Sequence, residues 1–237
     1  MITIRNITVI CGLATLAACS TITGPKGNNT SRAQFLDEVW VAPSVKGKAV
    51  SELYTKVHFT PVATGRLESQ SWWSAQSPIK QKELHAEARQ LAQHMNGVLD
   101  NAARNDPARR LTVVSQPGPD TVIVDMAIIE LVPAKAYWNS AATAAGFVVP
   151  GAGLLSAAGS GSVGIEGRVR DGKTGAVIAS FRHHMKDKMA VVNINSYKWY
   201  AGSQANLDEI AGKIAQVLNS APSTVVNASS PIKLAAY

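Results

Sequence analysis

Apolar residues recur at helical spacing in two long stretches of the chain. The first stretch follows Ser77, which can cap a helix, and Pro78, which suits the first helical position. Asp106-Pro107 is expected to end this helix. The second stretch runs from about Ser203 to Asn219. Both are predicted to be amphipathic helices. Their apolar stripes are Leu84, Ala88, Leu91, Met95, Val98 and Ala102 in the first, and Leu207, Ile210, Ala211, Ile214, Val217 and Leu218 in the second.

Shorter stretches in the first half of the chain have the patterns of β-strands. Apolar and polar residues alternate over residues 53–60, and Pro61 is expected to end that strand. A short strand is predicted at residues 111–114. Residues 121–132 are apolar at nearly every position, which is typical of a central strand whose two faces are both covered.

The second half of the chain contains a predicted β-hairpin. Apolar and polar residues alternate over 163–170 and again over 177–181. Between them, the residues Asp-Gly-Lys-Thr-Gly at 171–175 have the composition of a turn. Residues 189–194 could add a further strand.

Together these elements predict an α+β fold, with a single antiparallel or mixed β-sheet and two main helices packed on one face. One domain is expected over residues 35–219, since about 200 residues suffice for one sizeable core. Residues 220–237 are rich in Ser, Ala and Asn and are predicted to form a flexible C-terminal tail.

Residues 1–18 have the three regions of a secretory signal peptide. Arg5 supplies positive charge, residues 7–16 are apolar but too few to span a bilayer, and Ala17-Ala18 precede Cys19. The run Leu-Ala-Ala-Cys at 16–19 resembles the bacterial lipobox, which implies cleavage before Cys19 and acylation of that cysteine. The alternative is that Cys19 merely falls near a cleavage site.

Acylation of Cys19, with palmitate among the acyl groups, would anchor the chain to a lipid bilayer. Ser20 follows the cysteine, and by the rule for lipoprotein sorting this residue implies the outer membrane, facing the periplasm. Residues 19–34 contain little that could be buried and are predicted to be a flexible tether. Signal cleavage would remove Cys11, the only other cysteine, so the mature chain would have no free thiol, disulfide or cysteine-metal site.

The formal net charge is +7, and scattered basic residues form no long run of like charge. This balance favours solubility, and lipid phosphates or acidic envelope polymers are alternative partners. An exported chain without a basic aromatic strip is not expected to bind nucleic acid.

Several short motifs occur in an order that resembles an uncharacterised bacterial lipoprotein family, domain of unknown function 3313. The resemblance covers roughly residues 35–218 and implies a lipoprotein with the same fold. The family has no established catalytic residues, so it implies none for this chain. The motifs are Phe35-Leu36, His58-Phe59-Thr60-Pro61-Val62, Gly118-Pro119-Asp120-Thr121, a Gly-rich stretch, and Ile165-Glu166 leading into Asp171 and Thr174-Gly175.

Two features are candidates for contact with a partner. The first is residues 136–165, thirty residues without a charge, in which Phe147 and Leu154 are apolar points. This segment could be a packed loop, a partner-binding segment, or an element that inserts into the membrane in an oligomer. The second is the pair Trp199 and Tyr200, just before the final helix. Such aromatic residues, like Trp72-Trp73 before the first helix, can stack on sugars or anchor interfaces, but filling the core is their commoner use.

Few residues indicate a reaction. Residues 159–164 fit G-x-G-x-x-G, but a strand rather than a helix follows, so no dinucleotide cofactor is expected. The histidines do not converge by spacing, and no metal is expected. His85 and His94 lie on opposite sides of one helix, and the neighbours His183 and His184 lie on opposite faces of a strand.

Asp125 is the most unusual carboxylate, because it interrupts the apolar run at 122–129. One hypothesis is that burial raises its pKa for acid–base catalysis. The hypothesis we favour is a partly exposed face or a hydrogen bond to the next element.

We therefore expect an outer-membrane-anchored periplasmic lipoprotein that acts as a non-catalytic binding or envelope-structural module, with no cofactor. Its expected partners are the bilayer, through Cys19, and an envelope protein or further copies of the chain. One alternative is an oligomeric secretion or assembly lipoprotein, similar in layout to the curli-export lipoproteins, that inserts its Gly-rich segment. A second alternative is a periplasmic hydrolase acting on envelope polymer.

Overall fold

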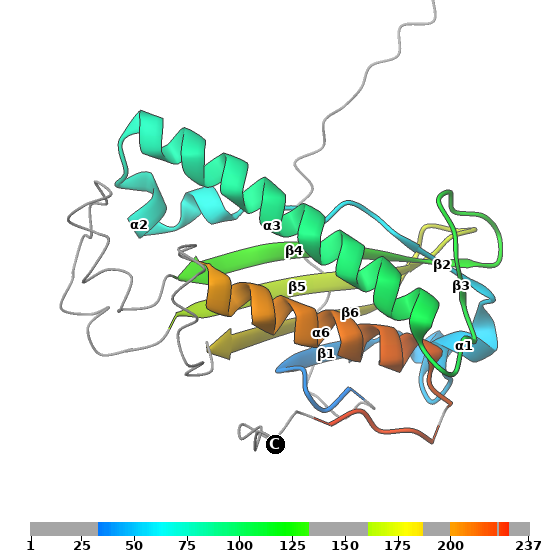
Figure 1. The fold of residues 1–237 in the computed structure, drawn as a ribbon. Coiled ribbons are helices and arrows are strands. Elements are labelled where there is room, and N and C mark those ends of the chain that lie inside the picture. The colour runs from blue at the N-terminus through cyan, green and yellow to red at the C-terminus, as the bar shows by residue number, and fades with distance from the viewer. Residues whose placement is uncertain (1–32, 133–160, 187–199, 222, 228–237) are drawn as a thin grey trace, which may run out of the picture.

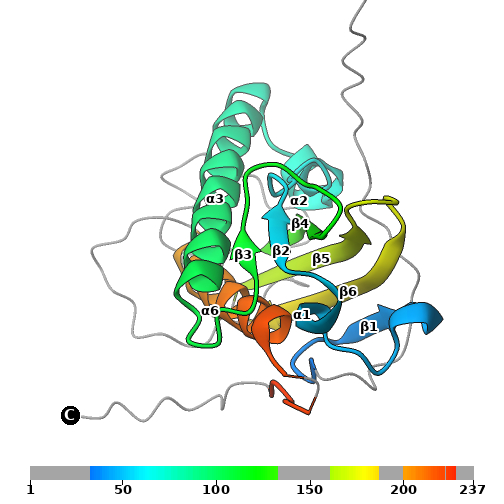
Figure 2. The same ribbon diagram turned by 90° about the vertical axis from the view of Figure 1, so that its right-hand side faces the viewer.

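A computed structural model of the chain describes residues 33–132, 161–186, 200–221 and 223–227. Within them, one six-stranded sheet has the strand order β1-β6-β5-β4-β2-β3, and the two long helices lie on the same face of it (Figures 1 and 2). The strands are β1 (Glu38–Val41), β2 (Lys56–Phe59), β3 (Thr112–Val113), β4 (Thr121–Val132), β5 (Ser162–Asp171) and β6 (Val177–Lys186). The helices are α1 (Val50–Leu53), α2 (Ser71–Ser74), α3 (Pro78–Asn105) and α6 (Ala201–Asn219), with 3-10 turns at Pro43–Val45 and Leu67–Ser69.

The sheet is mixed, because β2 runs parallel to β3 and β4 while every other neighbouring pair is antiparallel. This confirms the predicted α+β fold. The predicted strand over residues 121–132 is confirmed as β4, which lies between β5 and β2 and is buried along most of its length. The predicted hairpin is confirmed as β5 and β6. In its turn, Asp171 Oδ1 accepts hydrogen bonds from the backbone N–H groups of Lys173 and Thr174 at 3.0 and 2.7 Å.

Both predicted helices are present. Ser77 caps α3 by accepting a hydrogen bond from the Lys80 backbone N–H at 3.3 Å, and α3 ends at Asn105, directly before Asp106. The buried stripe of α3 shifts by one residue in its last turns, where Leu99 and Ala103 are buried in place of the predicted Val98 and Ala102. This shift follows from the helical period of 3.6 residues, which rotates a regular apolar stripe slowly around the axis.

The first fifty residues of the domain differ from the sequence prediction. The strand predicted over residues 53–60 begins only at Lys56, because residues 50–53 form the helical turn α1. The pattern also did not indicate β1, a four-residue strand at the edge of the sheet. The strand suggested at residues 189–194 lies outside the described residues, and so do residues 136–160 of the uncharged segment. The last residues of that segment begin β5.

Packing extends slightly beyond residues 35–219. Val226 is buried, and its carbonyl accepts a hydrogen bond from the Gln34 backbone N–H at 3.1 Å, in a parallel bridge between Ala33 and Val226. The two ends of the folded part of the chain therefore lie side by side. Among the described helices, none combines the length and the apolar character that crossing a bilayer would require.

Candidate functional site

The face of the sheet opposite to the helices carries two buried carboxylates. Along β4, Val124 and Met126 point into the helix-covered core, so the intervening Asp125 points to the other face. Asp125 is only 5% exposed. Its carboxylate accepts hydrogen bonds from Arg168 Nε at 2.7 Å and from Arg170 Nε and Nη2 at 2.6 and 2.9 Å. The Thr60 hydroxyl donates a further bond at 3.1 Å.

These contacts determine the charge state of Asp125. Burial disfavours the ionised carboxylate, but the hydrogen bonds and charges of Arg170 and Arg168 outweigh burial, so the pKa of the Asp125 carboxyl is lowered from its usual value. The hypothesis of a raised pKa is therefore wrong, and the expected hydrogen bond to the neighbouring element is confirmed. Glu166 repeats the arrangement nearby, with Arg66 at 2.6 Å and Arg182 at 3.2 Å. Through these hydrogen bonds and ion pairs, Asp125 and Glu166 connect neighbouring strands with loops on this face of the sheet.

Four of the histidines lie beside carboxylates, and the fifth, His58, contacts the Val114 carbonyl through Nδ1 at 3.0 Å. His85 lies 3.5 Å from Glu68, and His94 Nε2 lies 2.5 Å from Asp208 Oδ1, which links α3 to α6. Over the described part of the chain, no cluster of three or more His, Cys, Asp or Glu side chains could hold a metal ion.

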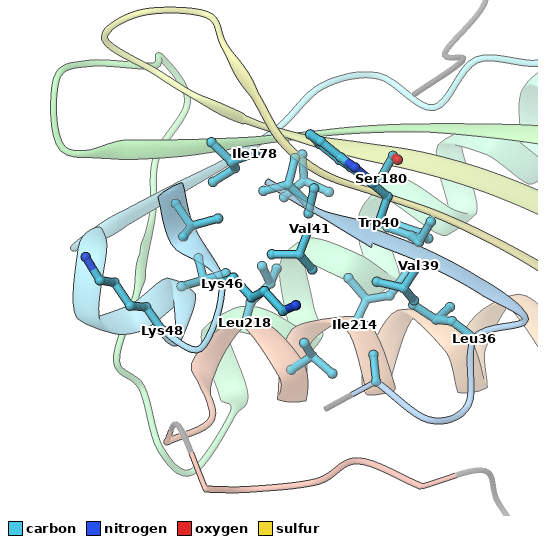
Figure 3. A pocket seen from close by; sticks show the side chains of 18 of the residues that line it. Leu36, Val39, Trp40, Val41, Lys46, Lys48, Ile178, Ser180, Ile214 and Leu218 are labelled. Atoms are coloured by element: carbon cyan, nitrogen blue, oxygen red, sulfur yellow. The ribbon is translucent and has the colours of Figure 1, made fainter. Parts of the chain in front are cut away.

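An apolar pocket of about 560 Å³ lies between the sheet, α6 and the segment that runs from Ala33 to Leu53, here called the wall segment (Figure 3). The residues that line it come from five separate parts of the chain. On the sheet side they include Val124, Val169 and Ile178, and on the helix side Ile214, Val217 and Leu218. The remaining wall is formed by Phe35, Leu36, Val39, Trp40, Val41, Val45, Val50 and Leu53.

The wall segment is held in place near its C-terminal end by hydrogen bonds to α6 and to the hairpin turn. The Ser51 hydroxyl of α1 donates to the Ser220 carbonyl at the end of α6, at 3.1 Å. Tyr54 is buried, and its hydroxyl donates to Asp171 Oδ2 in the hairpin turn at 2.9 Å. Burial, together with the hydrogen bond and charge of Asp171, raises the pKa of Tyr54 to about 12. The phenol therefore stays protonated at neutral pH and can keep donating this bond.

Gly167, on the central strand β5, shapes the pocket. Gly167 on β5 lies opposite Phe181 on β6, and Phe181 also lines the pocket. A Cβ atom at position 167 would lie 2.3 Å from Cζ of the Phe181 ring, closer than two carbon atoms can approach. The absence of a side chain at Gly167 therefore lets the ring lie against the sheet instead of being pushed into the hollow.

Two lysines stand at one end of this apolar pocket. Lys46 and Lys48 are exposed, flank Gly47 in the loop between β1 and α1, and are among the lining residues. Gly47 has a φ of 82°, a left-handed conformation that favours glycine and permits the sharp turn of this loop. In Figure 3 the Lys46 side chain reaches across the opening toward α6, near Leu218, whereas Lys48 extends outward. No carboxylate of the described residues forms an ion pair with either lysine.

Of the lipidation and partner-binding residues that the sequence predicted, only Tyr200 belongs to the described part of the chain, and it does not line this pocket. Cys19, Phe147, Leu154 and Trp199 lie outside the described residues. Tyr200 is 3% exposed and belongs to the hydrophobic core at the start of α6. The Lys-Gly-Lys sequence at 46–48, which follows the 3-10 turn after β1, was the sequence signal that could have indicated the pocket opening.

A family model described as "Protein of unknown function (DUF3313)" matches residues 28–199. No curated protein matches the chain. Two solved structures with some similarity are PelC dodecamers from Paraburkholderia phytofirmans. One is 12% identical, with 77% of this chain and 98% of that chain covered and a TM-score of 0.39. The other, a variant, is 13% identical, with 77% and 95% covered and a TM-score of 0.38. Likenesses this low in TM-score carry no conclusion for this chain.

Proposed function

This chain belongs to the DUF3313 family of proteins of unknown function, and we propose that it is an outer-membrane-anchored periplasmic lipoprotein whose domain binds an apolar ligand without catalysing a reaction. The observation that carries this proposal is the pocket between the sheet, α6 and the wall segment. Its volume of about 560 Å³ lies within the usual range for small-molecule sites, roughly 300–1,000 Å³, and such sites are lined mainly by apolar side chains.

The hydrolase alternative has less support from the geometry. A general acid must hold a proton near neutral pH, but the Arg168 and Arg170 guanidinium groups keep Asp125 ionised and occupy its oxygens. The assembly alternative depends on the uncharged segment, most of which lies outside the described residues. The pocket therefore makes ligand binding the better-supported proposal.

The anchor can be tested by replacing Cys19 with alanine. We expect the wild-type chain to incorporate radiolabelled palmitate in growing bacteria and to float with outer-membrane vesicles in a density gradient. The Cys19→Ala variant should lose the label and leave the membrane fraction, because several acyl chains are needed for stable anchoring. An unlabelled wild type, together with a Cys19→Ala variant that still floats, would contradict the proposed anchor.

The pocket can be tested by filling it. Val41 is half-buried on the edge strand β1 and points into the hollow in Figure 3, so the indole of Val41→Trp would occupy ligand space. We expect this variant to bind the uncharged dye Nile red about tenfold more weakly, a loss of about 1.4 kcal/mol of binding free energy. Fluorescence titration measures the effect.

Ile79→Trp provides the matched control, because Ile79 is 77% exposed on α3 and does not line the pocket. This variant should bind the dye as the wild type does. Thermal unfolding of both variants checks that each is folded. A folded Val41→Trp protein that binds Nile red with wild-type affinity would show that the dye binds outside the pocket. The proposed site would then be wrong.

A further inference from the structure

We propose that the ligand of this pocket is a long-chain fatty acid, whose hydrocarbon chain fills the hollow and whose carboxylate meets Lys46 at the opening, with the charge of Lys48 adding to the positive potential there. This inference rests on the proposed function and specifies the chemistry of the same site.

The distribution of polarity over the pocket supports an amphiphile. Apolar side chains such as Leu36, Val41 and Leu218 line the hollow. At one end the loop that carries Lys46 and Lys48 closes it, and the Lys46 side chain reaches over the opening while Lys48 extends outward (Figure 3). An entirely apolar ligand would leave this pair of charges without a role. A ligand with one apolar chain and one anionic end fits both parts of the site.

The position of the charges supports a carboxylate that stays hydrated. Lys46 and Lys48 are both exposed, so an anion beside them would keep contact with water and would not have to be fully desolvated. Neither lysine forms an ion pair with a carboxylate of the described residues, so the positive charge of both is left uncompensated by those residues, and the ammonium group of Lys46 can meet a ligand. No arginine lines the pocket. The forked recognition that arginine gives to phosphate groups is therefore absent from its lining, which favours a simple carboxylate.

The attachment of the chain supports a ligand drawn from the membrane. Ala33 lines the pocket, and only 13 residues separate it from Cys19. A flexible tether of that length, as the sequence predicts for this segment, would span about 20 Å on average. If Cys19 is acylated as proposed, the pocket is held close to the bilayer surface, where long-chain fatty acids partition. A volume typical of one small ligand suits a single chain better than a two-chain phospholipid.

The test uses the full chain carrying Cys19→Ala, purified without detergent, so that no acyl group of the protein competes for the pocket. Binding of palmitate and of hexadecanol, which has the same chain length and no charge, is measured by equilibrium dialysis with radiolabelled ligands. We expect palmitate to bind more tightly. Adding Lys46→Glu and Lys48→Glu should weaken palmitate binding about five- to tenfold and weaken hexadecanol binding less, because exposed ion pairs are worth up to about a factor of five each.

Lys82→Glu is the matched control, since Lys82 is an exposed lysine on α3 that does not line the pocket. Its charge reversal should leave palmitate binding unchanged. Circular dichroism checks that every variant is folded. Equal affinities for palmitate and hexadecanol, with no effect of the lysine reversals, would overturn the fatty-acid inference and leave an apolar site intact.

Three further outcomes separate the remaining possibilities. Lysophosphatidic acid that binds more than tenfold tighter than palmitate would overturn the carboxylate head and indicate a phosphate. Palmitate binding to the Cys19→Ala chain but not to the acylated wild type in vesicles would overturn a free fatty acid and assign the pocket to the protein's own acyl group. If neither palmitate nor hexadecanol binds, and Val41→Trp binds Nile red as the wild type does, the proposed function itself is rejected.

Discussion

Replacing Trp73 with alanine should lower the free energy of unfolding by about 3–5 kcal/mol, the usual cost of removing a buried aromatic side chain. Trp73 is 1% exposed. Its ring packs edge-on against the rings of Trp72 at 5.5 Å and His85 at 5.4 Å, which ties α2 to α3. Urea denaturation followed by circular dichroism measures the change.

Trp73→Phe is the informative control. The Trp73 Nε1–H group is buried, and the described residues offer it no hydrogen-bond partner. Phenylalanine keeps an aromatic ring while removing this unsatisfied donor, so it should cost clearly less than alanine. The sequence left open whether Trp72-Trp73 stack on sugars or fill the core, and the burial of both indicates the core. A Trp73→Ala protein of wild-type stability that had lost binding to an envelope sugar would contradict this interpretation.

Asp125→Ala should destabilise the domain by about 3 kcal/mol, because it leaves two partly buried guanidinium groups without their counterion. Arg168 and Arg170 would then face each other across the space that the carboxylate occupied. The effect is measured by urea denaturation at pH 7. Asp100→Ala removes an exposed carboxylate paired with Arg104 on α3 and should change stability little. A similar small effect for both variants would show that the Asp125 cluster does not hold the outer face together.

The pH dependence distinguishes this ion cluster from simple packing. The pKa of Asp125 is lower in the folded chain than in the unfolded chain, so the folded state gains stability from its ionisation above the unfolded pKa of about 4. This stability is lost as pH falls below about 4 and through the lowered folded pKa. The difference between wild type and Asp125→Ala should therefore shrink on acidification. A difference that stays constant from pH 7 to pH 2.5 would argue against the electrostatic explanation.

The parts of the fold that the sequence predicted are those with a local signal. The stripe of α3 together with its Ser77 cap, the apolar run of β4 and the turn at 171–175 are each encoded within a few neighbouring residues. The strand β1 is not encoded in this way. It has four residues, and its hydrogen-bonding partner β6 lies about 140 residues further along the chain, so long-range pairing rather than alternation defines it.

The candidate site was harder to predict for the same reason. The apolar run interrupted by Asp125 left open whether the carboxylate is buried or lies on a partly exposed face. The sign of its pKa shift depends on Arg168 and Arg170, which follow 43 and 45 residues later. The pocket likewise combines side chains from β1, α1, the sheet and α6. Each of these residues looks like an ordinary core position on its own, and only their meeting leaves a hollow.

The edge position of β1 has a consequence for how quickly a ligand could exchange. Within the described sheet β1 pairs with β6 alone, so this strand of the pocket wall is held by one ladder of backbone hydrogen bonds, whereas β4 is held by two. Local unfolding of such an element costs a fraction of the free energy of global unfolding. The residence time of a bound molecule would then be governed by brief departures of this strand from the sheet, while the rest of the domain stays folded.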